Sequence, residues 1–77
     1  MLKSENEYKA GAMRILINGL VEYKYWMLDG EDLNTTFFNF LIDALKKENV
    51  NIDLLNDVNY IDGLIVGFQT AERYLED

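Results

Sequence analysis

Three carboxylates lie close together in the stretch DGED, as Asp29, Glu31 and Asp32. Carboxylates at such spacing could bind calcium or act as a general acid and base. A calcium loop of the EF-hand type needs oxygen ligands at its first, third and fifth positions and Glu at the twelfth. Here Leu33 stands at the fifth position and Phe40 at the twelfth. We therefore expect no metal at these residues and interpret them as an exposed acidic loop.

Most catalytic designs need residue types that this chain lacks. It has no His and no Cys, which excludes Ser-His and Cys-His nucleophile pairs and imidazole or thiolate metal ligands. The remaining carboxylates, lysines and tyrosines lie in no recognisable catalytic motif, and no phosphate-binding glycine loop is present. The sequence predicts a non-enzymatic protein without catalytic residues, metal or cofactor.

An aromatic cluster, Tyr23, Tyr25 and Trp26, directly precedes the acidic stretch. A base-stacking platform would need interleaved Lys and Arg, and only Lys24 is close, so direct nucleic-acid binding is not expected. If the segment is helical, Tyr23 and Trp26 point to the core or to a subunit interface. Tyr25 then lies beside the acids as an aromatic anchor at a charged edge. The predicted partner-binding residues are Tyr25, Asp29, Glu31 and Asp32.

Length and charge restrict the class of protein further. Seventy-seven residues form one small domain, residues 1–77, which has little surface to bury and no disulfide to support it. Oligomerisation is the remaining common aid to stability. The net charge of −7 would repel nucleic acids and anionic membranes, whereas the 49% hydrophobic content is too high for a disordered chain. We expect a protein partner of basic character.

Features of the ends and of the composition bear on location. The first residues lack the apolar core of a signal peptide, and no apolar run approaches the roughly 20 residues of a membrane span. The absence of Cys is compatible with a reducing compartment. We expect a cytoplasmic protein without membrane contact. The bias of eight Asn and no Pro is loosely associated with an AT-rich source such as a mobile element.

Hydrophobic periodicity predicts an all-α fold, a compact bundle of three helices. Ser4 and Glu7 fit a capping box before the first helix, and Asp29-Gly30 supplies a stop signal after it. Either Asp32 or Asn34 can cap the second helix. The predicted helices cover about residues 4–28, 35–48 and 59–76, with a short helical turn near 52–56.

A second interpretation of the first segment gives an α+β fold. Asn-Gly between apolar runs is a strong hairpin signal, and Asn18-Gly19 lies between two such runs. Against it, the helical period continues across these two residues.

The first helix is apolar nearly all round, so it must be buried nearly all round. If the other two helices cover only one side, the remainder forms a face that a homodimer would bury. Alternatively the other helices cover that face within the monomer. The predicted oligomer interface consists of Met13, Ile17, Leu20, Met27 and Leu28.

Small residues recur every four positions in the third helix. Because Gly inside a helix costs about 1 kcal/mol relative to Ala, two of them indicate a close approach by another helix. Close helix packing is therefore predicted at Gly63, Gly67 and Ala71.

Two classes of function fit these observations. The first is a small interaction module, of the inhibitor, antitoxin or adaptor type, that acts on a basic protein, with a homodimer as the expected form. The second is an inhibitor that mimics nucleic acid by presenting carboxylates in place of phosphates. Mimicry needs the acids on one face, whereas here they are spread through all three helices among basic residues.

Overall fold

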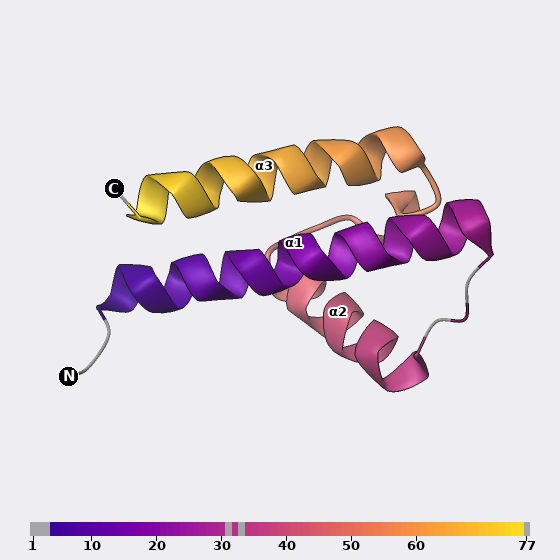
Figure 1. Cartoon of the computed structure of the whole chain (residues 1–77), viewed down its shortest axis with the longest axis horizontal. Coiled ribbons are helices and arrows are strands. Elements are labelled where there is room, and N and C mark those ends of the chain that lie inside the picture. The colour runs from indigo at the N-terminus through magenta and orange to yellow at the C-terminus, as the bar shows by residue number, and fades with distance from the viewer. Residues whose placement is uncertain (1–3, 31, 33, 77) are drawn as a thin grey trace.

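The described part of the chain folds into three helices and one 3₁₀ turn, arranged as Figure 1 shows. The structure, a computed structural model, describes residues 4–30, 32 and 34–76. Its elements are α1 (Glu5–Asp29), α2 (Thr35–Lys47), the 3₁₀ turn η1 (Ile52–Leu54) and α3 (Val58–Glu76). No strand occurs in these described ranges, so the predicted all-α class is confirmed.

The alternative prediction of a hairpin at Asn18-Gly19 is wrong. α1 continues through both residues, because the helical spacing of apolar residues that precedes them also follows them. Capping interactions at both ends stabilise the helix. At the first end, the Ser4 hydroxyl accepts the backbone N–H of Glu7 at 3.2 Å. At the other end, Gly30 adopts the left-handed conformation with φ 69° and donates its N–H to a carbonyl of the last turn.

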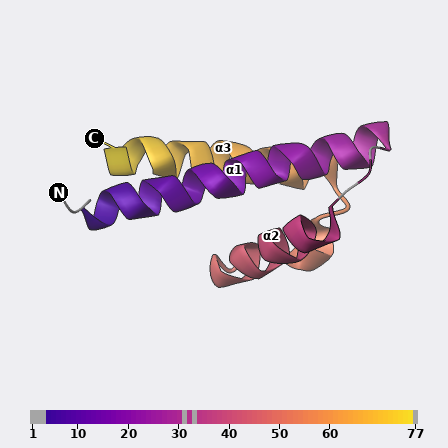
Figure 2. The same cartoon turned by 60° about the horizontal axis from the view of Figure 1, so that its bottom comes forward.

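α1 and α3 lie antiparallel and side by side in both views (Figures 1 and 2). Their lengths of 25 and 19 residues let α3 cover one face of α1 over several turns. Leu20 and Ile61 are fully buried in the core, together with Leu45 from α2. The shared core, extended by partly buried residues such as Leu64 and Phe68 of α3, is the main apolar cluster of the molecule.

α2 packs on α1 at Gly19 and runs at an angle to it, as Figure 1 shows. A Cβ atom added at Gly19 would lie 2.7 Å from Cδ1 of Leu41 and 3.4 Å from Cζ of Phe37. Because real carbon atoms pack at about 3.5–4.0 Å, any larger residue at this position would force the side chain of Leu41 to move. Gly19, which resembled a turn residue in the sequence, is the point where α2 crosses α1.

The segment after α2 returns the chain to α3. Asn49, with φ 62°, ends α2, and the N–H groups of Asn49 and Val50 donate to the carbonyls of Lys46 and Leu45. This pair of bonds is a Schellman motif. The predicted helical turn is found at Ile52–Leu54.

The face of α1 predicted to be exposed is largely inside the monomer. Met13, Ile17 and Leu20 are buried, and Met27 packs partly against the core, whereas Leu28 is 58% exposed. The prediction of an exposed face is therefore wrong for the first three residues, because α3 is long enough to cover that stripe. The alternative, burial within the monomer, is the arrangement observed for them.

The prediction of close helix packing at Gly63 and Gly67 is also wrong. No atom lies within 4 Å of a Cβ built at either residue, and both are exposed on α3. Ala71 instead packs at the margin of the core. The physical reason is that α3 turns its larger side chains, such as Ile61 and Leu64, toward α1 and leaves its glycines on the outer side.

Candidate functional site

The last two turns of α1 carry the predicted charged edge. Glu22, Tyr25 and Asp29 follow one another at spacings of three and four residues, which places them on one helix face. All three are exposed, and Tyr25 is 52% exposed. Asp32 in the following loop is exposed as well, while Glu31 lies outside the described residues. We call Glu22, Tyr25, Asp29 and Asp32 the acidic edge.

Tyr23 is buried beside this edge and Tyr25 is exposed, as their helical positions predict, whereas Trp26 is only partly covered. Tyr23 is buried and stacks on Phe38 of α2, with ring centroids 5.7 Å apart. Trp26 was assigned to the core or to an interface, and it contacts Tyr23 but remains 38% exposed. Part of the indole ring is therefore available at the surface next to the acidic edge.

A hollow joins the acidic edge to the start of α2. It is open to solvent, has a volume of about 710 Å³, and is lined by Glu22, Asp32, Asn34, Thr36, Phe37 and Phe40. Asn34 is the cap of α2, since its side-chain oxygen accepts the N–H of Phe37 at 3.0 Å. This cap fixes the first turn of α2, and with it the two phenylalanines, relative to the loop that carries Asp32.

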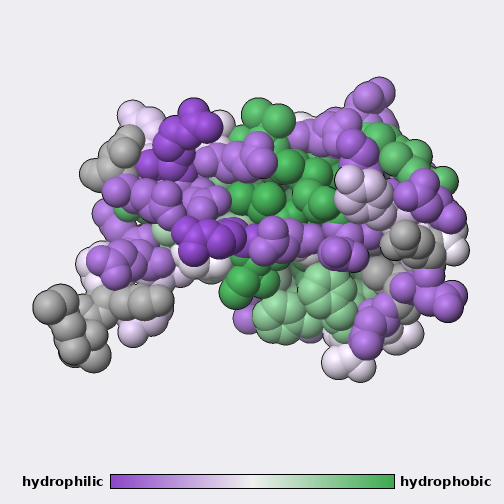
Figure 3. Space-filling model, viewed as in Figure 1, coloured by the Kyte–Doolittle hydropathy of each residue, from purple (hydrophilic) through white to green (hydrophobic). Residues whose placement is uncertain are grey.

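A second, smaller hollow of about 180 Å³ continues along the same side of the molecule. Its lining residues are Ala12, Ile15, Leu16, Phe40, Ala44, Lys47 and Glu48. Phe40 borders both hollows, so the two form one furrow between α1 and α2, which we call the α1–α2 groove. In Figure 3, hydrophobic side chains reach the surface over α2, beside the hydrophilic row of α1.

Sequence reasoning did not identify Ile15 and Phe40 as exposed. They are 53% and 58% exposed, although both belong to the apolar pattern of their helices. A signal was present in the length of α2: its 13 residues extend only about 20 Å, too short to cover all of α1. Its apolar arc is also wider than one contact with α1 can bury.

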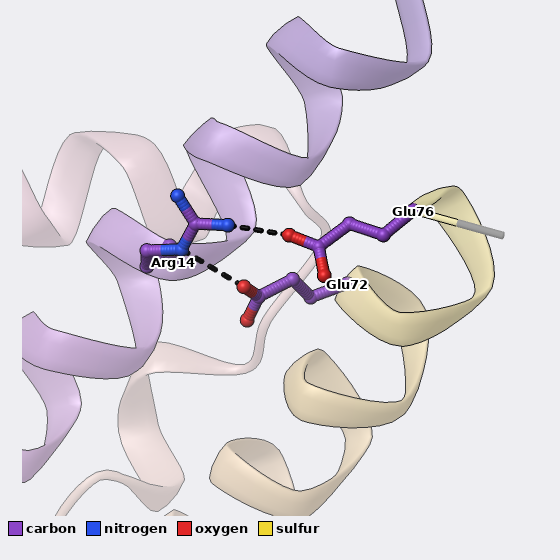
Figure 4. Close-up of polar contacts among 3 residues, drawn as sticks. All are labelled: Arg14, Glu72 and Glu76. Carbon is purple, nitrogen blue, oxygen red and sulfur yellow. Dashed lines mark hydrogen bonds and ion pairs between the residues drawn. The ribbon is translucent and has the colours of Figure 1, made fainter.

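Ion pairs are distributed unevenly around α1. Arg14 binds Glu72 at 2.9 Å and also pairs with Glu76, both on α3 (Figure 4). Its hydrogen bond to Glu72 and the two nearby carboxylates raise the pKa of Arg14 above its ordinary value. Lys24 binds Asp62 of α3 at 2.6 Å. Arg14 and Lys24 of α1 thus serve the contact with α3, whereas Lys9 pairs with Glu5 of α1 itself at 3.2 Å.

The acids on the opposite side have no such partners. Among residues 4–30, 32 and 34–76, no ion pair includes Glu22, Asp29, Asp32 or Asp43, and none joins α1 to α2. Within the same ranges, no group of three acidic side chains could hold a metal ion. The groove side therefore combines uncompensated negative charge with exposed apolar surface.

Comparisons with known proteins gave no relative. No family model matches the chain, and no curated protein sequence or solved structure is similar to it.

The shape of the groove bears on the kind of ligand that it could bind. Sites for small molecules enclose most of the ligand surface, whereas both hollows here are shallow and open along the surface. An open apolar furrow with charge on one side suits part of a folded polypeptide. Among the described residues, no helix is both long and apolar enough to cross a membrane.

Proposed function

We propose that the chain is a small, non-enzymatic interaction module, of the inhibitor, antitoxin or adaptor type, that binds a basic protein in the cytoplasm. The observation that carries the proposal is the charge asymmetry: Arg14 and Lys24 of α1 pair with α3, while Glu22, Asp29 and Asp32 are exposed and take part in no ion pair among the described residues. Tyr25 supplies an aromatic contact in the middle of these acids.

Electrostatics give this arrangement a physical role. A surface of one sign accelerates encounter with a partner of opposite sign and rejects partners of like charge. The net charge of −7 extends that preference over the whole molecule. The effect falls off over the Debye length, about 8 Å at physiological ionic strength, so local acids decide where the partner docks.

The homodimer remains a second element of the proposal, on the part of the predicted surface that is exposed in the monomer. Three of the five residues proposed for its interface are in the core, and Leu28 is the most exposed of the other two. A dimer would therefore form around residues such as Leu28. The molecular mass in solution, compared between the wild type and Leu28→Glu, tests this element.

Nucleic-acid mimicry receives less support from the charges. Three of the carboxylates on α3, those of Asp62, Glu72 and Glu76, are paired with bases of α1 and so do not act as isolated phosphate equivalents.

Charge reversal at the acidic edge tests the proposal. We expect Glu22→Lys with Asp32→Lys to abolish capture of basic proteins from a lysate of the cells that make this protein. The matched control, Glu7→Lys with Asp53→Lys, changes net charge equally at exposed residues outside the acidic edge and should retain capture. An equal loss of capture in both double variants would show that binding depends on the total charge rather than on the acidic edge.

A further inference from the structure

We propose that the α1–α2 groove binds one amphipathic helix of the partner, with an apolar stripe against Phe40 and basic residues toward Asp32. This inference rests on the proposed function and names the part of the partner that is recognised. Its basis is the apolar groove, and the acidic residues around the groove select the occupant.

The groove exists because α2 is shorter than α1 and packs on it around Gly19. In Figure 1, α2 runs at an angle to α1. Ile15 of α1 is left 53% exposed, and Tyr8, two turns earlier, is 60% exposed. Phe40, 58% exposed, forms the opposite wall. Apolar side chains on both walls of a furrow lose their contact with water only when a third element lies between them.

A helix fits this furrow better than an extended strand. The backbone groups of α1 and α2 are used in their own helices, so the walls offer no ladder of hydrogen bonds to a strand. A helix satisfies its own backbone and presents a stripe of side chains at spacings of three and four. Phe37, Phe40 and Ala44 recur along α2 at the same spacings and would interdigitate with that stripe.

The charges around the groove favour a basic helix. Glu22 and Asp32 line its wider end, and Asp43 is exposed one turn after Phe40. Lys47 stands at the narrow end beside Glu48, so that end is close to neutral. The basic residues of the bound helix should therefore lie at the end near Asp32.

The same charges disfavour a second copy of this chain as the occupant. A two-fold contact through the groove presents the same patch from both subunits. In such a contact both copies carry the net charge of −7 and bring Glu22 and Asp32 to the interface, and like charges across an interface are repulsive. A helix of opposite charge meets no such penalty.

A displayed library of helical peptides tests the inference. Each peptide has about 18 residues, with its buried stripe varied between apolar and polar residues and its flanks varied among Lys, Glu and Gln. We expect wild-type protein to enrich peptides with an apolar stripe and with Lys toward one end. Enrichment of acidic or neutral flanks, enrichment without helical periodicity, or no enrichment would overturn the inference.

Variants of the groove locate the binding of the enriched peptides. Phe40→Ala and Ile15→Ala, both at exposed positions, should each weaken binding about tenfold or more, as central aromatic and apolar anchors do. The control Tyr74→Ala changes a residue of α3 that is 84% exposed, and it should leave affinity within about twofold. Circular dichroism confirms the helical content of each variant. Equal affinity in Phe40→Ala and the control would overturn the proposed site.

Comparison with the charge-reversal experiment separates the two proposals. A basic partner that is lost with Glu22→Lys and Asp32→Lys but is retained by Phe40→Ala would overturn the helix inference and leave the acidic edge as the binding surface. A dimer of the wild type that dissociates on Phe40→Ala would assign the groove to a second copy and overturn the inference as well. The absence of both a basic partner and enriched peptides would overturn both proposals.

Discussion

Replacing Gly19 by Ala tests the packing that places α2, and therefore the α1–α2 groove. Two effects of the substitution oppose each other. Ala is favoured over Gly in a helix interior by about 1 kcal/mol. The new methyl group, however, would lie 2.7 Å from Cδ1 of Leu41, about 1 Å closer than carbon atoms normally pack.

The surroundings of Leu41 decide which effect is larger. The leucine is only 3% exposed and belongs to the core cluster, so its terminal methyl group has little room to move away. Phe37, whose Cζ atom would lie 3.4 Å from the new methyl group, restricts it further. Overpacking of a core typically costs about 1–3 kcal/mol. We expect the free energy of unfolding of Gly19→Ala to change by about 0 to −2 kcal/mol.

Gly11→Ala provides the control within the same helix. No atom lies within 4 Å of a Cβ built there. The free energy of unfolding of this variant should therefore rise by the whole difference in helix propensity between Ala and Gly, about 1 kcal/mol. Urea unfolding followed by circular dichroism should therefore separate the two variants by about 1–3 kcal/mol, which for a domain of this size is at least about 4 °C in Tm. Equal stabilisation of both variants would refute the close contact between α1 and α2.

Three further predictions concern the ends of the helices and one buried ring. Gly30→Ala should lower the free energy of unfolding by about 1 kcal/mol in urea denaturation, because φ 69° is unfavourable for a residue with a Cβ. Asn34→Ala should cost about 1 kcal/mol by removing the cap of α2, whereas Asn34→Asp should cost much less; equal losses would contradict the capping role. Burial raises the pKa of Tyr23 above 10.0, so the unfolded phenol loses its proton first and stability declines as pH rises from about 10 through the folded pKa. Tyr23→Phe should therefore lose less stability between pH 7 and pH 11 than the wild type does. An equal loss of stability in the variant and the wild type would contradict this source of alkaline instability.

The positions of the helices could be predicted because local signals determine them. Residues 35–48 were predicted for the second helix, and α2 covers Thr35–Lys47. The ends of α1 agree within one residue because Ser4 and Gly30 act as cap and stop signal through neighbouring backbone groups. Such interactions depend only on residues close in sequence, so a single chain reveals them.

The arrangement of the helices could not be predicted in the same way. α1 is apolar on nearly every face, so its pattern does not indicate which face meets α3, and Ile17 and Leu20 were assigned to a surface that α3 covers. Glycine spacing was equally ambiguous: the close contact is at Gly19, whereas Gly67 has open space around it. Both outcomes depend on contacts between residues far apart in sequence.

The candidate site was predicted in part. The structure brings Asp32 together with Glu22 along one hollow and leaves Tyr25 exposed beside them. The exposure of Phe40 was missed, because it results from the way α2 packs on α1 rather than from the place of Phe40 in the apolar pattern of α2.

Backbone amide shifts of ¹⁵N-labelled protein, recorded as an enriched basic helical peptide is added, test the central claim most directly. We expect the largest changes along the α1–α2 groove, at Ile15, Phe37, Phe40 and Ala44, and we expect them to diminish as salt is raised. Largest changes on the outer face of α3, around Val66 and Tyr74, with the groove unaffected, would contradict the central claim.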